Sequence, residues 1–325
     1  TMQETRVQLT EMAKDVLEGL TSNPKHLNSK YFYDANGSLI FQRIMNMPEY
    51  YLTDCEEEIF RNQKHTIYQA FAGNNRDPFD LVELGAGDGK KTRVLLRHFL
   101  ENNNNHSTYI PVDISEEIMI KLIKDLENDL PKLEVKGKIG DYFKLMNELS
   151  KLDKTRKVLL FLGSNIGNFN KQKSISFLRQ LRETMNPEDK LFIGFDLKKD
   201  PEVILKAYND PHGYTSSFNL NLLRRINEEL KADFELLQFR HHEVYDPQTG
   251  TARSFLISRK KQNVRIDALD KNIHFEKWEP IFMEMSQKYD LRMIEELASL
   301  SGFEVVKNFT DSRNYFLDSL WGIKT

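Results

Sequence analysis

The sequence predicts an α/β fold with a Rossmann-like, doubly wound parallel sheet and a second, smaller α+β unit. Short apolar runs alternate with helical stretches between residues 80 and 196, which is the pattern of successive βαβ units. A glycine-rich turn follows the first of these runs, as in many parallel sheets that bind a ligand at their carboxyl edge. The chain of 325 residues is also longer than a single hydrophobic core usually serves, so two units are expected.

The parallel part of the sheet is predicted to have strands at residues 80–84, 108–112, 134–139, 157–162 and 190–196. A helix at 291–300 and strands at 303–309 and 315–322 are predicted to close the same sheet. The alternation stops after residue 196, where helices at 201–208 and 218–230 precede a hairpin of strands 234–245 and 252–258. The sequence therefore predicts one domain of residues 61–200 and 287–325, and a second domain of residues 1–60 and 201–286.

The first sixty residues are predicted to be mostly helical. An amphipathic run spans residues 8–20, and an unusually aromatic segment follows at 29–51. Thr53 and Glu56, three residues apart, form a capping box that is expected to start the next helix. Glu56 and the two glutamates after it would then lie in the first turn, where the helix dipole favours anions. They are interpreted as helix-stabilising and not catalytic.

The composition argues against several classes of partner. Lys and Arg total 46 and Asp and Glu total 49, evenly spread, so no nucleic-acid partner is expected. No run approaches the roughly 18 apolar residues of a membrane span, and the N-terminus does not resemble a signal peptide. Cys55 is the only cysteine, so no intrachain disulfide can form and a cytoplasmic location is expected. His241 and His242 would face opposite sides of a strand, so no metal site is predicted.

The clearest local motif runs from Glu83 to Lys91, with the sequence ELGAGDGKK. Glycines at such a turn let the backbone approach a ligand closely at the edge of the sheet. A dinucleotide fingerprint would need a third glycine where Lys90 stands, and the P-loop pattern cannot be drawn through this segment. The spacing of Glu83, Gly85, Gly87 and Gly89 is instead typical of methyltransferases that use S-adenosylmethionine. The sequence therefore predicts this cofactor.

Polar residues also end the second and third predicted strands. Asp113 is placed to accept hydrogen bonds from both ribose hydroxyls of the cofactor. Asp141 can accept from the adenine amine, and the ring of Tyr142 can cover the base. Structural alternatives exist for each carboxylate, because Asp113 could cap the helix that begins near Ser115 and Asp141 could fill a turn.

Several longer segments resemble one family. SKYFYDANGSLIFQRIMNMPEYYLT, LVELGAGDGKKTR, FLGSNIGNF, DLKKD, AYND and FNLNLLRRIN are similar to the histidine-specific Nα-methyltransferases of ergothioneine biosynthesis. The resemblance extends from about Lys25 to the C-terminus. It implies a class I methyltransferase domain with an inserted and N-terminal α+β substrate-binding domain. It further implies an enzyme that trimethylates the α-amine of L-histidine to hercynine. Separately from the resemblance, a monomer is expected.

The resemblance also implies roles for individual residues. The cofactor positions are Glu83, Gly85, Gly87, Lys91, Asp113, Asp141 and Tyr142. The substrate positions are Tyr33, Tyr50, Gly163, Asn168, Tyr208, Ser254, Glu284 and Ser286. Among these, Asn168 and Tyr208 correspond to residues that hold the substrate carboxylate, and Glu284 and Ser286 to the pair that reads the imidazole nitrogens. Tyr33 and Tyr50 correspond to aromatic residues around the amine and the imidazole, and Tyr33 and Asn168 are the residues expected to act in catalysis.

Two positions depart from the family pattern. Asn165 stands where threonine is common, and Ser254 where a methionine lines the imidazole pocket. A smaller polar residue at 254 predicts a wider or wetter pocket and a looser choice of substrate. Two alternatives therefore stay open: methylation of another amino acid, such as a tryptophan derivative, and a non-catalytic protein that only binds the cofactor. Tyr33 and Tyr50 could also be core aromatics, Glu284 a solvated acid, and Ser286 a helix N-cap.

Overall fold

The computed structural model describes residues 9–73, 78–102, 108–140, 142–152 and 155–324. The chain divides into two compact units, which we call unit 1 (Thr1–Tyr51 and Lys199–Ser286) and unit 2 (Leu52–Lys198 and Gln287–Thr325). The predicted domain boundaries at 60/61 and 200/201 lie near these limits, and residues 52–60 belong to unit 2. The function assigned to each unit stays a prediction.

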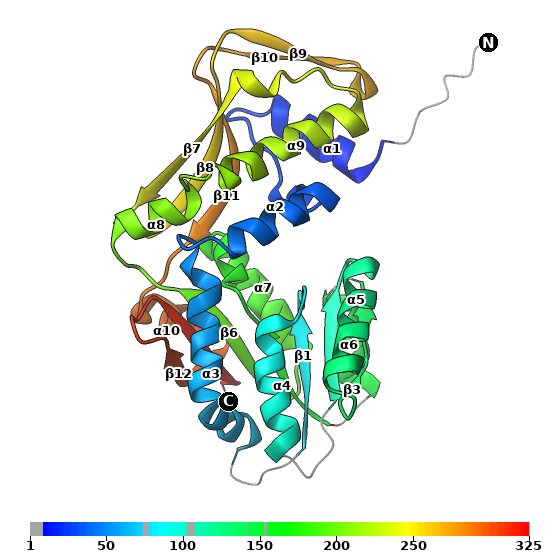
Figure 1. Ribbon diagram of the computed structural model, residues 1–325, viewed down its shortest axis with the longest axis vertical. Coiled ribbons are helices and arrows are strands. Elements are labelled where there is room, and N and C mark those ends of the chain that lie inside the picture. The colour runs from blue at the N-terminus through cyan, green and yellow to red at the C-terminus, as the bar shows by residue number, and fades with distance from the viewer. Residues whose placement is uncertain (1–8, 74–77, 103–107, 141, 153–154, 325) are drawn as a thin grey trace, which may run out of the picture. The chain divides into compact units, whose positions relative to one another are not determined.

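Among the described residues, unit 2 contains one sheet of eight strands in the order β12-β13-β6-β5-β1-β2-β3, with β4 also paired to β2 (Figure 1). The strands are β1 Phe79–Leu84, β2 Thr108–Asp113, β3 Glu134–Val135, β4 Lys138–Ile139, β5 Arg156–Phe161, β6 Lys190–Asp196, β12 Phe303–Thr310 and β13 Phe316–Ile323. Strands β1, β2, β5 and β6 are parallel, whereas β12 and β13 run antiparallel at one edge. This is the predicted Rossmann-like α/β fold. The strand predicted at 134–139 is two short strands instead, β3 and β4.

Helices cover both faces of the unit 2 sheet, which explains why β1 and β2 are buried along their whole length. The helices are α3 Tyr51–Ala72, α4 Lys90–Asn102, α5 Glu116–Asp129, α6 Tyr142–Leu152, α7 Lys171–Glu183 and α10 Leu291–Leu300. One face packs against α6, α7 and α10, as Met146, Leu178 and Ile294 show. On the other face, the Phe60 ring of α3 stacks on Phe192 of β6, with ring centroids 6.2 Å apart.

Unit 1 is an α+β unit with a three-stranded sheet in the order β11-β8-β7 and a two-stranded ribbon of β9 and β10. The strands are β7 Phe239–Asp246, β8 Thr251–Ser258, β9 Gln262–Ile266, β10 Lys271–Phe275 and β11 Pro280–Gln287. The helices are α1 Glu11–Thr21, α2 Ala35–Met45, α8 Pro201–Tyr208 and α9 Tyr214–Leu230, with short 3-10 turns that include η1 Ser29–Phe32. The predicted hairpin is present as β7 and β8. Strands β9, β10 and β11 are absent from the sequence-based prediction, although buried Val264, Ile266, Ile273, Phe275, Ile281 and Met283 mark their period of two.

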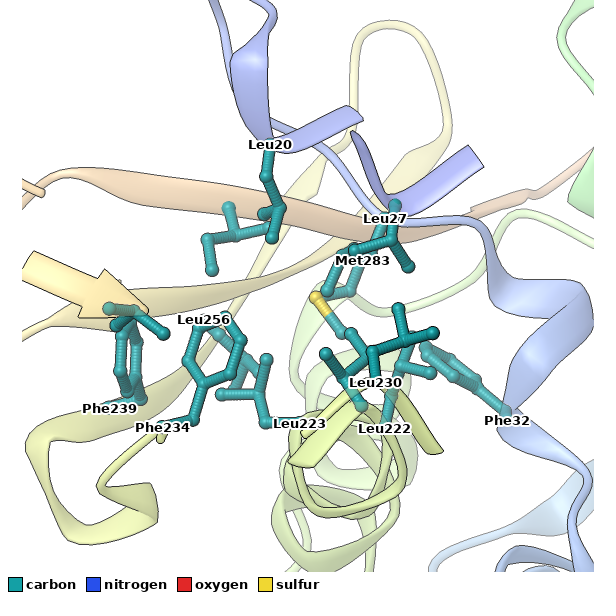
Figure 2. Packing of buried hydrophobic residues seen from close by; sticks show 14 of the residues in the cluster. Leu20, Leu27, Phe32, Leu222, Leu223, Leu230, Phe234, Phe239, Leu256 and Met283 are labelled. Carbon is teal, nitrogen blue, oxygen red and sulfur yellow. The ribbon is translucent and has the colours of Figure 1, made fainter. Parts of the chain in front are cut away.

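Unit 1 has a hydrophobic core of its own. Leu222, Leu223 and Leu230 of α9 pack with Phe239 of β7 and Leu256 of β8, as Figure 2 shows. The N-terminal segment contributes Leu20, Leu27 and Phe32 to the same core. Burial of these side chains stabilises the segment that carries the aromatic residues 29–51, at about 1.5 to 3 kcal/mol for each fully buried large side chain.

Helix α3 begins earlier than predicted. It starts at Tyr51, so Thr53 lies inside the helix and the predicted capping box is wrong. Tyr51, Leu52, Cys55, Glu56, Ile59 and Phe60 are all buried, at the spacing of one helix face. Glu56 therefore lies on the buried face of α3. In the part of the chain that the structure describes, no helix is both long and apolar enough to span a membrane.

Candidate active site

The glycine-rich loop between β1 and α4 adopts backbone angles that suit glycine. Gly85, Gly87 and Gly89 have φ values of 71°, 55° and 62°, which L side chains rarely adopt. A Cβ atom at Gly85 would lie 3.0 Å from the hydroxyl oxygen of Tyr142. The Gly85 N–H donates to the Val112 carbonyl at 2.8 Å, which ties the loop to the end of β2. The loop therefore offers its backbone for close approach by a ligand at the carboxyl edge of the sheet.

Glu83 supports this loop from inside the fold. It is only 4% exposed, and its two carboxylate oxygens accept hydrogen bonds from the Thr92 hydroxyl at 2.8 Å and from the Tyr109 hydroxyl. Burial raises the pKa of Glu83 to about 7, although both hydrogen bonds favour the carboxylate. Because Glu83 is almost fully buried and both its oxygens bind groups of unit 2, it supports the loop from inside the fold, and its predicted place in the cofactor site stays a prediction.

Asp113, at the end of β2, lies at the same edge. Its Oδ2 accepts from the Gly87 N–H at 3.3 Å and its Oδ1 from the Ser115 N–H at 3.0 Å. Ser115 is the residue that caps α5, since its hydroxyl accepts from the Ile118 N–H at 3.3 Å. Carboxylate oxygens accept more than one hydrogen bond, so Asp113 can hold the loop and also accept from a ribose hydroxyl.

Asp141 and Tyr142 are the residues predicted for the third position along this edge of the sheet. Asp141 lies outside the described residues, and its contact with the adenine amine stays a prediction. Tyr142 is the first residue of α6, and its hydroxyl reaches the edge of the glycine loop at Gly85.

Lys91, near the start of α4, is held by an acid that the sequence analysis misinterprets. Glu56 is fully buried, and its carboxylate forms an ion pair with the Lys91 ammonium. The same carboxylate accepts the Gly163 N–H, at 2.9 Å to Oε1 and 3.2 Å to Oε2. Desolvation alone would lower the pKa of Lys91, but the attraction and hydrogen bond of Glu56 raise it overall, so Lys91 is a cation. Glu56 is thus not the helix-stabilising first-turn acid that the sequence predicts. Its place among the apolar residues of one face of α3 is the pattern that could have revealed its burial.

The segment after β5 presents Asn168. Gly163 and Ser164 have φ values of 72° and 56°, and the Ser164 hydroxyl accepts from the Asp196 N–H at 2.9 Å. A Cβ atom at Gly167 would lie 2.9 Å from the Gln287 carbonyl oxygen, so this turn is packed too closely for another residue. Asn168 ends the 3-10 turn η2 (Asn165–Asn168) and is exposed, and within the described ranges its side chain has no hydrogen-bond partner. Its amide is available to a ligand.

Five predicted substrate residues gather in unit 1. The Tyr208 hydroxyl lies 3.2 Å from the Ser286 hydroxyl oxygen, and the Tyr50 and Tyr208 rings meet edge to face at 6.3 Å. Desolvation, and then the negative charge of Glu284, raise the pKa of Tyr33 well above its ordinary value. Tyr33 nevertheless remains 47% exposed, so it is not a fully buried core aromatic.

Ser286 lies on β11, and Asp290 caps the helix that follows, so Ser286 is not an N-cap. The predicted partners come from an aromatic segment, from the end of α8 and from β11, which are far apart in the chain. Their juxtaposition is a result of the tertiary fold.

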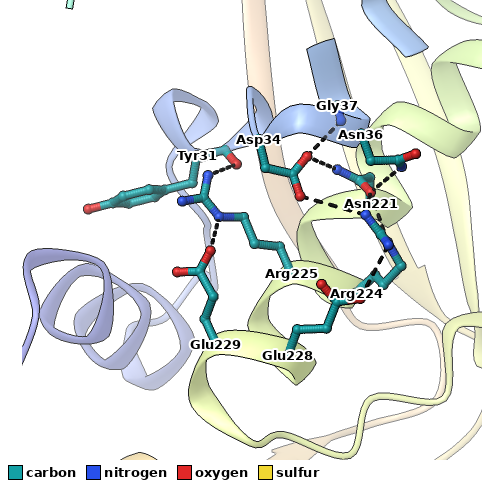
Figure 3. A network of polar contacts seen from close by, with 9 residues as sticks. All are labelled: Tyr31, Asp34, Asn36, Gly37, Asn221, Arg224, Arg225, Glu228 and Glu229. Atoms are coloured by element: carbon teal, nitrogen blue, oxygen red, sulfur yellow. Dashed lines mark hydrogen bonds and ion pairs between the residues drawn. The ribbon is translucent and has the colours of Figure 1, made fainter. Parts of the chain in front are cut away.

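A polar network anchors the segment that carries Tyr33. Asp34 caps α2 by accepting the Gly37 N–H at 2.6 Å, and it also accepts from the Asn221 amide of α9 at 2.8 Å. Arg225 of α9 donates to the Tyr31 carbonyl at 2.9 Å (Figure 3). These bonds fix the backbone on both sides of Tyr33, so its position is set by α9 as well as by its own segment.

Ser254 occupies a different environment from the one predicted. It is 4% exposed on β8, opposite Glu243 of β7, and its hydroxyl donates to Glu243 Oε2 at 2.5 Å. Where the family pattern has a large apolar side chain, this chain therefore has a buried hydrogen bond between Ser254 and Glu243. The Ser254 hydroxyl is bound to a protein group and does not depend on water for a partner. Glu243 is a residue that the sequence analysis does not identify, because its partner lies eleven positions away across a hairpin.

His241 fixes the backbone of Tyr208. Its Nε2 lies 2.9 Å from the Tyr208 carbonyl oxygen, which can only accept, so the proton of the ring is on Nε2. Burial lowers the pKa of His241, which keeps the ring neutral. Over the residues that the structure describes, no group of three or more His, Cys, Asp or Glu side chains is arranged to hold a metal ion.

The parallel sheet, the glycine loop at the carboxyl end of β1 and Asp113 at the end of β2 define an S-adenosylmethionine-dependent methyltransferase. The chain belongs to the family of S-adenosylmethionine-dependent, histidine-specific methyltransferases, whose model matches residues 12–322. It is 34% identical over 306 residues to "Histidine N-alpha-methyltransferase" of Mycolicibacterium smegmatis, covering 94% of this chain and 92% of that protein.

Two further relatives have other names. "Ergothioneine biosynthesis protein 1" of Neurospora crassa is 29% identical over 310 residues, which cover 91% of this chain and 33% of that protein. "L-tryptophan methyltransferase" of Psilocybe serbica is 26% identical over 316 residues, which cover 90% of this chain and 87% of that protein.

Proposed function

We propose that this enzyme transfers methyl groups from S-adenosylmethionine to the α-amine of L-histidine, and that three transfers give hercynine for ergothioneine biosynthesis. The observation that carries the choice of substrate is the cluster of Glu284, Ser286 and Tyr208 in unit 1, which has the donors and acceptors that an imidazole needs. The identity to a histidine Nα-methyltransferase supports it.

Unit 2 fits the cofactor through its own backbone and carboxylates. Gly85 and Gly87 leave room for the ligand, Asp113 has capacity for the ribose hydroxyls, and the Lys91 ammonium offers a positive charge at the same edge. The bound cofactor supplies an activated methyl group on its sulfonium. The protein has to orient the amine in line with that methyl group, which is a task of proximity and orientation.

The amine must be neutral to attack, and no strong base is required for this. An α-amino group titrates near roughly 8 in a peptide and at higher pH in a free amino acid, and desolvation beside a positive charge lowers its pKa in the site. Tyr33 stays a phenol at neutral pH because its pKa is raised by desolvation and by Glu284. We therefore assign Tyr33 the role of a hydrogen-bond partner of the amine and not of its base.

The carboxylate and the imidazole of the substrate would be held by different groups. Asn168 and Tyr208 are proposed to bind the carboxylate, as the family pattern implies. Glu284 is proposed to accept the imidazole N–H, while a hydroxyl from Ser286 or Tyr50 serves the other nitrogen. A ligand without the matching groups would leave buried polar atoms unpaired, which is the basis of the selectivity.

Tryptophan is the second candidate substrate, because a relative named as an L-tryptophan methyltransferase also matches most of the chain. The test is a product screen by mass over the twenty amino acids with S-adenosylmethionine. Trimethylhistidine as the main product is the expected result. A main product from tryptophan would support the second candidate, and no transfer even in a single turnover would indicate a non-catalytic binding protein.

We also propose that the enzyme acts in the cytoplasm as a monomer on a free amino acid. Cys55 is fully buried in α3, which protects its thiol and is compatible with a reducing compartment. Light scattering of the purified protein tests the oligomeric state.

A further inference from the structure

Three ionisable groups from three elements meet in the interior of unit 2. Glu56 comes from α3, Lys91 from α4 and Asp318 from β13. Glu56 and Asp318 are fully buried, and the Lys91 side chain is 23% exposed. Asp318 has no role in the sequence-based prediction, and Glu56 is predicted there only as a helix-stabilising acid.

Glu56 sits in a place that the fold builds for it. A Cβ atom at Gly194 of β6 would lie 2.7 Å from Glu56 Oε1, so a glycine in the sheet makes room for the carboxylate. There the carboxylate pairs with the Lys91 ammonium and accepts the Gly163 N–H at 2.9 Å. A single acid thus links the start of α4 to the turn after β5.

Asp318 lies against this acid with no donor of its own. Among the described residues, no N–H or hydroxyl donates to either of its carboxylate oxygens, and both are buried. Asp318 is the direct cross-strand partner of Gly194, the residue whose missing side chain makes room for Glu56 Oε1, so the two carboxyl groups lie on the same side of the sheet next to each other. Two ionised carboxylates repel and cannot hydrogen-bond, but a carboxylic acid donates to a carboxylate. One proton between the two groups satisfies both of them.

The charges around the pair agree with a single shared proton. Lys91 is the cation that faces Glu56 and Asp318, and Glu83 of β1 adds a further acid nearby. Burial, and then the negative charge of Glu56, raise the pKa of Asp318 well above its ordinary value. The cluster then holds one cation, one anion and one neutral acid, so no unpaired charge is buried.

We propose that Glu56 and Asp318 share one proton and act together as positioning residues for the cofactor site. Ionised Glu56 holds the Lys91 ammonium and the Gly163 amide in place, and protonated Asp318 holds Glu56. Both act through Lys91 and Gly163. This inference rests on the proposed function only in taking Lys91 as part of the S-adenosylmethionine site.

The test compares three variants by calorimetric binding of S-adenosylhomocysteine, which needs no amino-acid substrate. Asp318→Asn keeps the shape of the protonated acid and can donate to Glu56, so its affinity should stay within roughly twofold of the parent. Glu56→Gln removes the anion that holds Lys91, and its affinity should fall by roughly 10- to 150-fold. Glu57→Gln, which removes the neighbouring acid paired with Arg61, is the matched control and should change nothing.

A loss in Asp318→Asn as large as that in Glu56→Gln would overturn the proposal, because it would mean that Asp318 is ionised and pairs with Lys91. Unchanged affinity in Glu56→Gln would also overturn it. A parent protein that binds no S-adenosylhomocysteine would refute the proposed function, whereas the wrong amino-acid substrate would leave this comparison unaffected.

The pH dependence of thermal stability provides a second test. It compares only Asp318→Asn with the parent protein, so it can be made even if Glu56→Gln does not fold. Because the pKa of Asp318 is raised on folding, its contribution is fully present at low pH and is lost as the pH rises through the folded-state value. Asp318→Asn has no such titration. The Tm of Asp318→Asn minus that of the parent should therefore rise with increasing pH, and a difference that stays constant with pH would contradict the shared proton.

Discussion

The glycine-rich edge of unit 2 and the proposed amino-acid site of unit 1 are built in different ways. The cofactor edge is mainly backbone from one short segment, in which Gly85, Gly87 and Gly89 share left-handed angles. The proposed amino-acid site is made of side chains from distant segments, with Tyr33 and Tyr50 on one and Ser286 on another. The difference teaches that the cofactor can be predicted from a local sequence motif, whereas the choice of substrate depends on which distant segments pack together. The two sites should therefore respond separately to substitution.

The largest expected effect comes from removing the carboxylate of the substrate. Histamine keeps the imidazole and the amine but lacks the group that Asn168 and Tyr208 are proposed to hold. Two hydrogen bonds to a charged group are lost, so kcat/KM should fall by at least roughly 100-fold relative to histidine. Steady-state rates with both compounds measure this, and equal rates would show that neither residue binds the carboxylate.

Glu284→Ala should affect the pocket and leave the cofactor edge intact. The lost hydrogen bond between a carboxylate and the imidazole N–H should lower kcat/KM for histidine by roughly 10- to 150-fold. Binding of S-adenosylhomocysteine should stay the same. The histidine-to-tryptophan ratio of kcat/KM is the decisive measurement, and if it does not change, Glu284 does not read the imidazole.

Asp113→Ala is the converse experiment at the cofactor edge. It removes the acceptor for the ribose hydroxyls and the partner of the Gly87 N–H, so cofactor binding should weaken by about 1 to 3 kcal/mol. The histidine-to-tryptophan ratio should be preserved. Calorimetry measures the affinity of the variant for the cofactor. If Asp113→Ala binds the cofactor as tightly as the parent protein does, Asp113 is not part of the site.

Ser254→Met tests the departure from the family pattern. The change leaves the Glu243 carboxylate without its hydroxyl donor, so the free energy of unfolding should fall by about 1 to 3 kcal/mol. The added apolar volume should favour histidine over larger side chains by about 1 kcal/mol. Urea unfolding and the ratio of kcat/KM values measure the two effects. Ser254→Ala, which removes the hydroxyl without adding volume, should show only the first.

The smallest effect is expected for Tyr33→Phe. Because the pKa of Tyr33 is raised, its hydroxyl stays protonated across the working range and only orients the amine. Activity should fall by less than roughly tenfold, the effect of one neutral hydrogen bond. In a plot of kcat/KM against pH, the rising limb should keep its position, because it reports the pKa of the substrate's α-amine. A shift of that limb in the variant would identify Tyr33 as the base.

Much of unit 2 could be predicted from the sequence because its determinants are local. The alternation of apolar runs and helices identifies the parallel strands, and the spacing of Glu83, Gly85, Gly87 and Gly89 indicates the cofactor loop. Each of these patterns lies within a window of a few residues, where the backbone period and the steric freedom of glycine act directly. The resemblance to a known family then supplied the residues of the pocket, which no local pattern brings together.

The tertiary structure alone decided the roles that depend on distant partners. Glu56 meets Gly163 across 107 positions, and Ser254 meets Glu243 only because two strands pair in register. Glu83 is engaged inside the fold by Thr92 and Tyr109, although its motif indicated a ligand contact. The physical reason is that burial and hydrogen bonding of a polar side chain depend on which elements pack around it. The period of a helix or strand tells which face a residue occupies, but it does not tell what that face will meet.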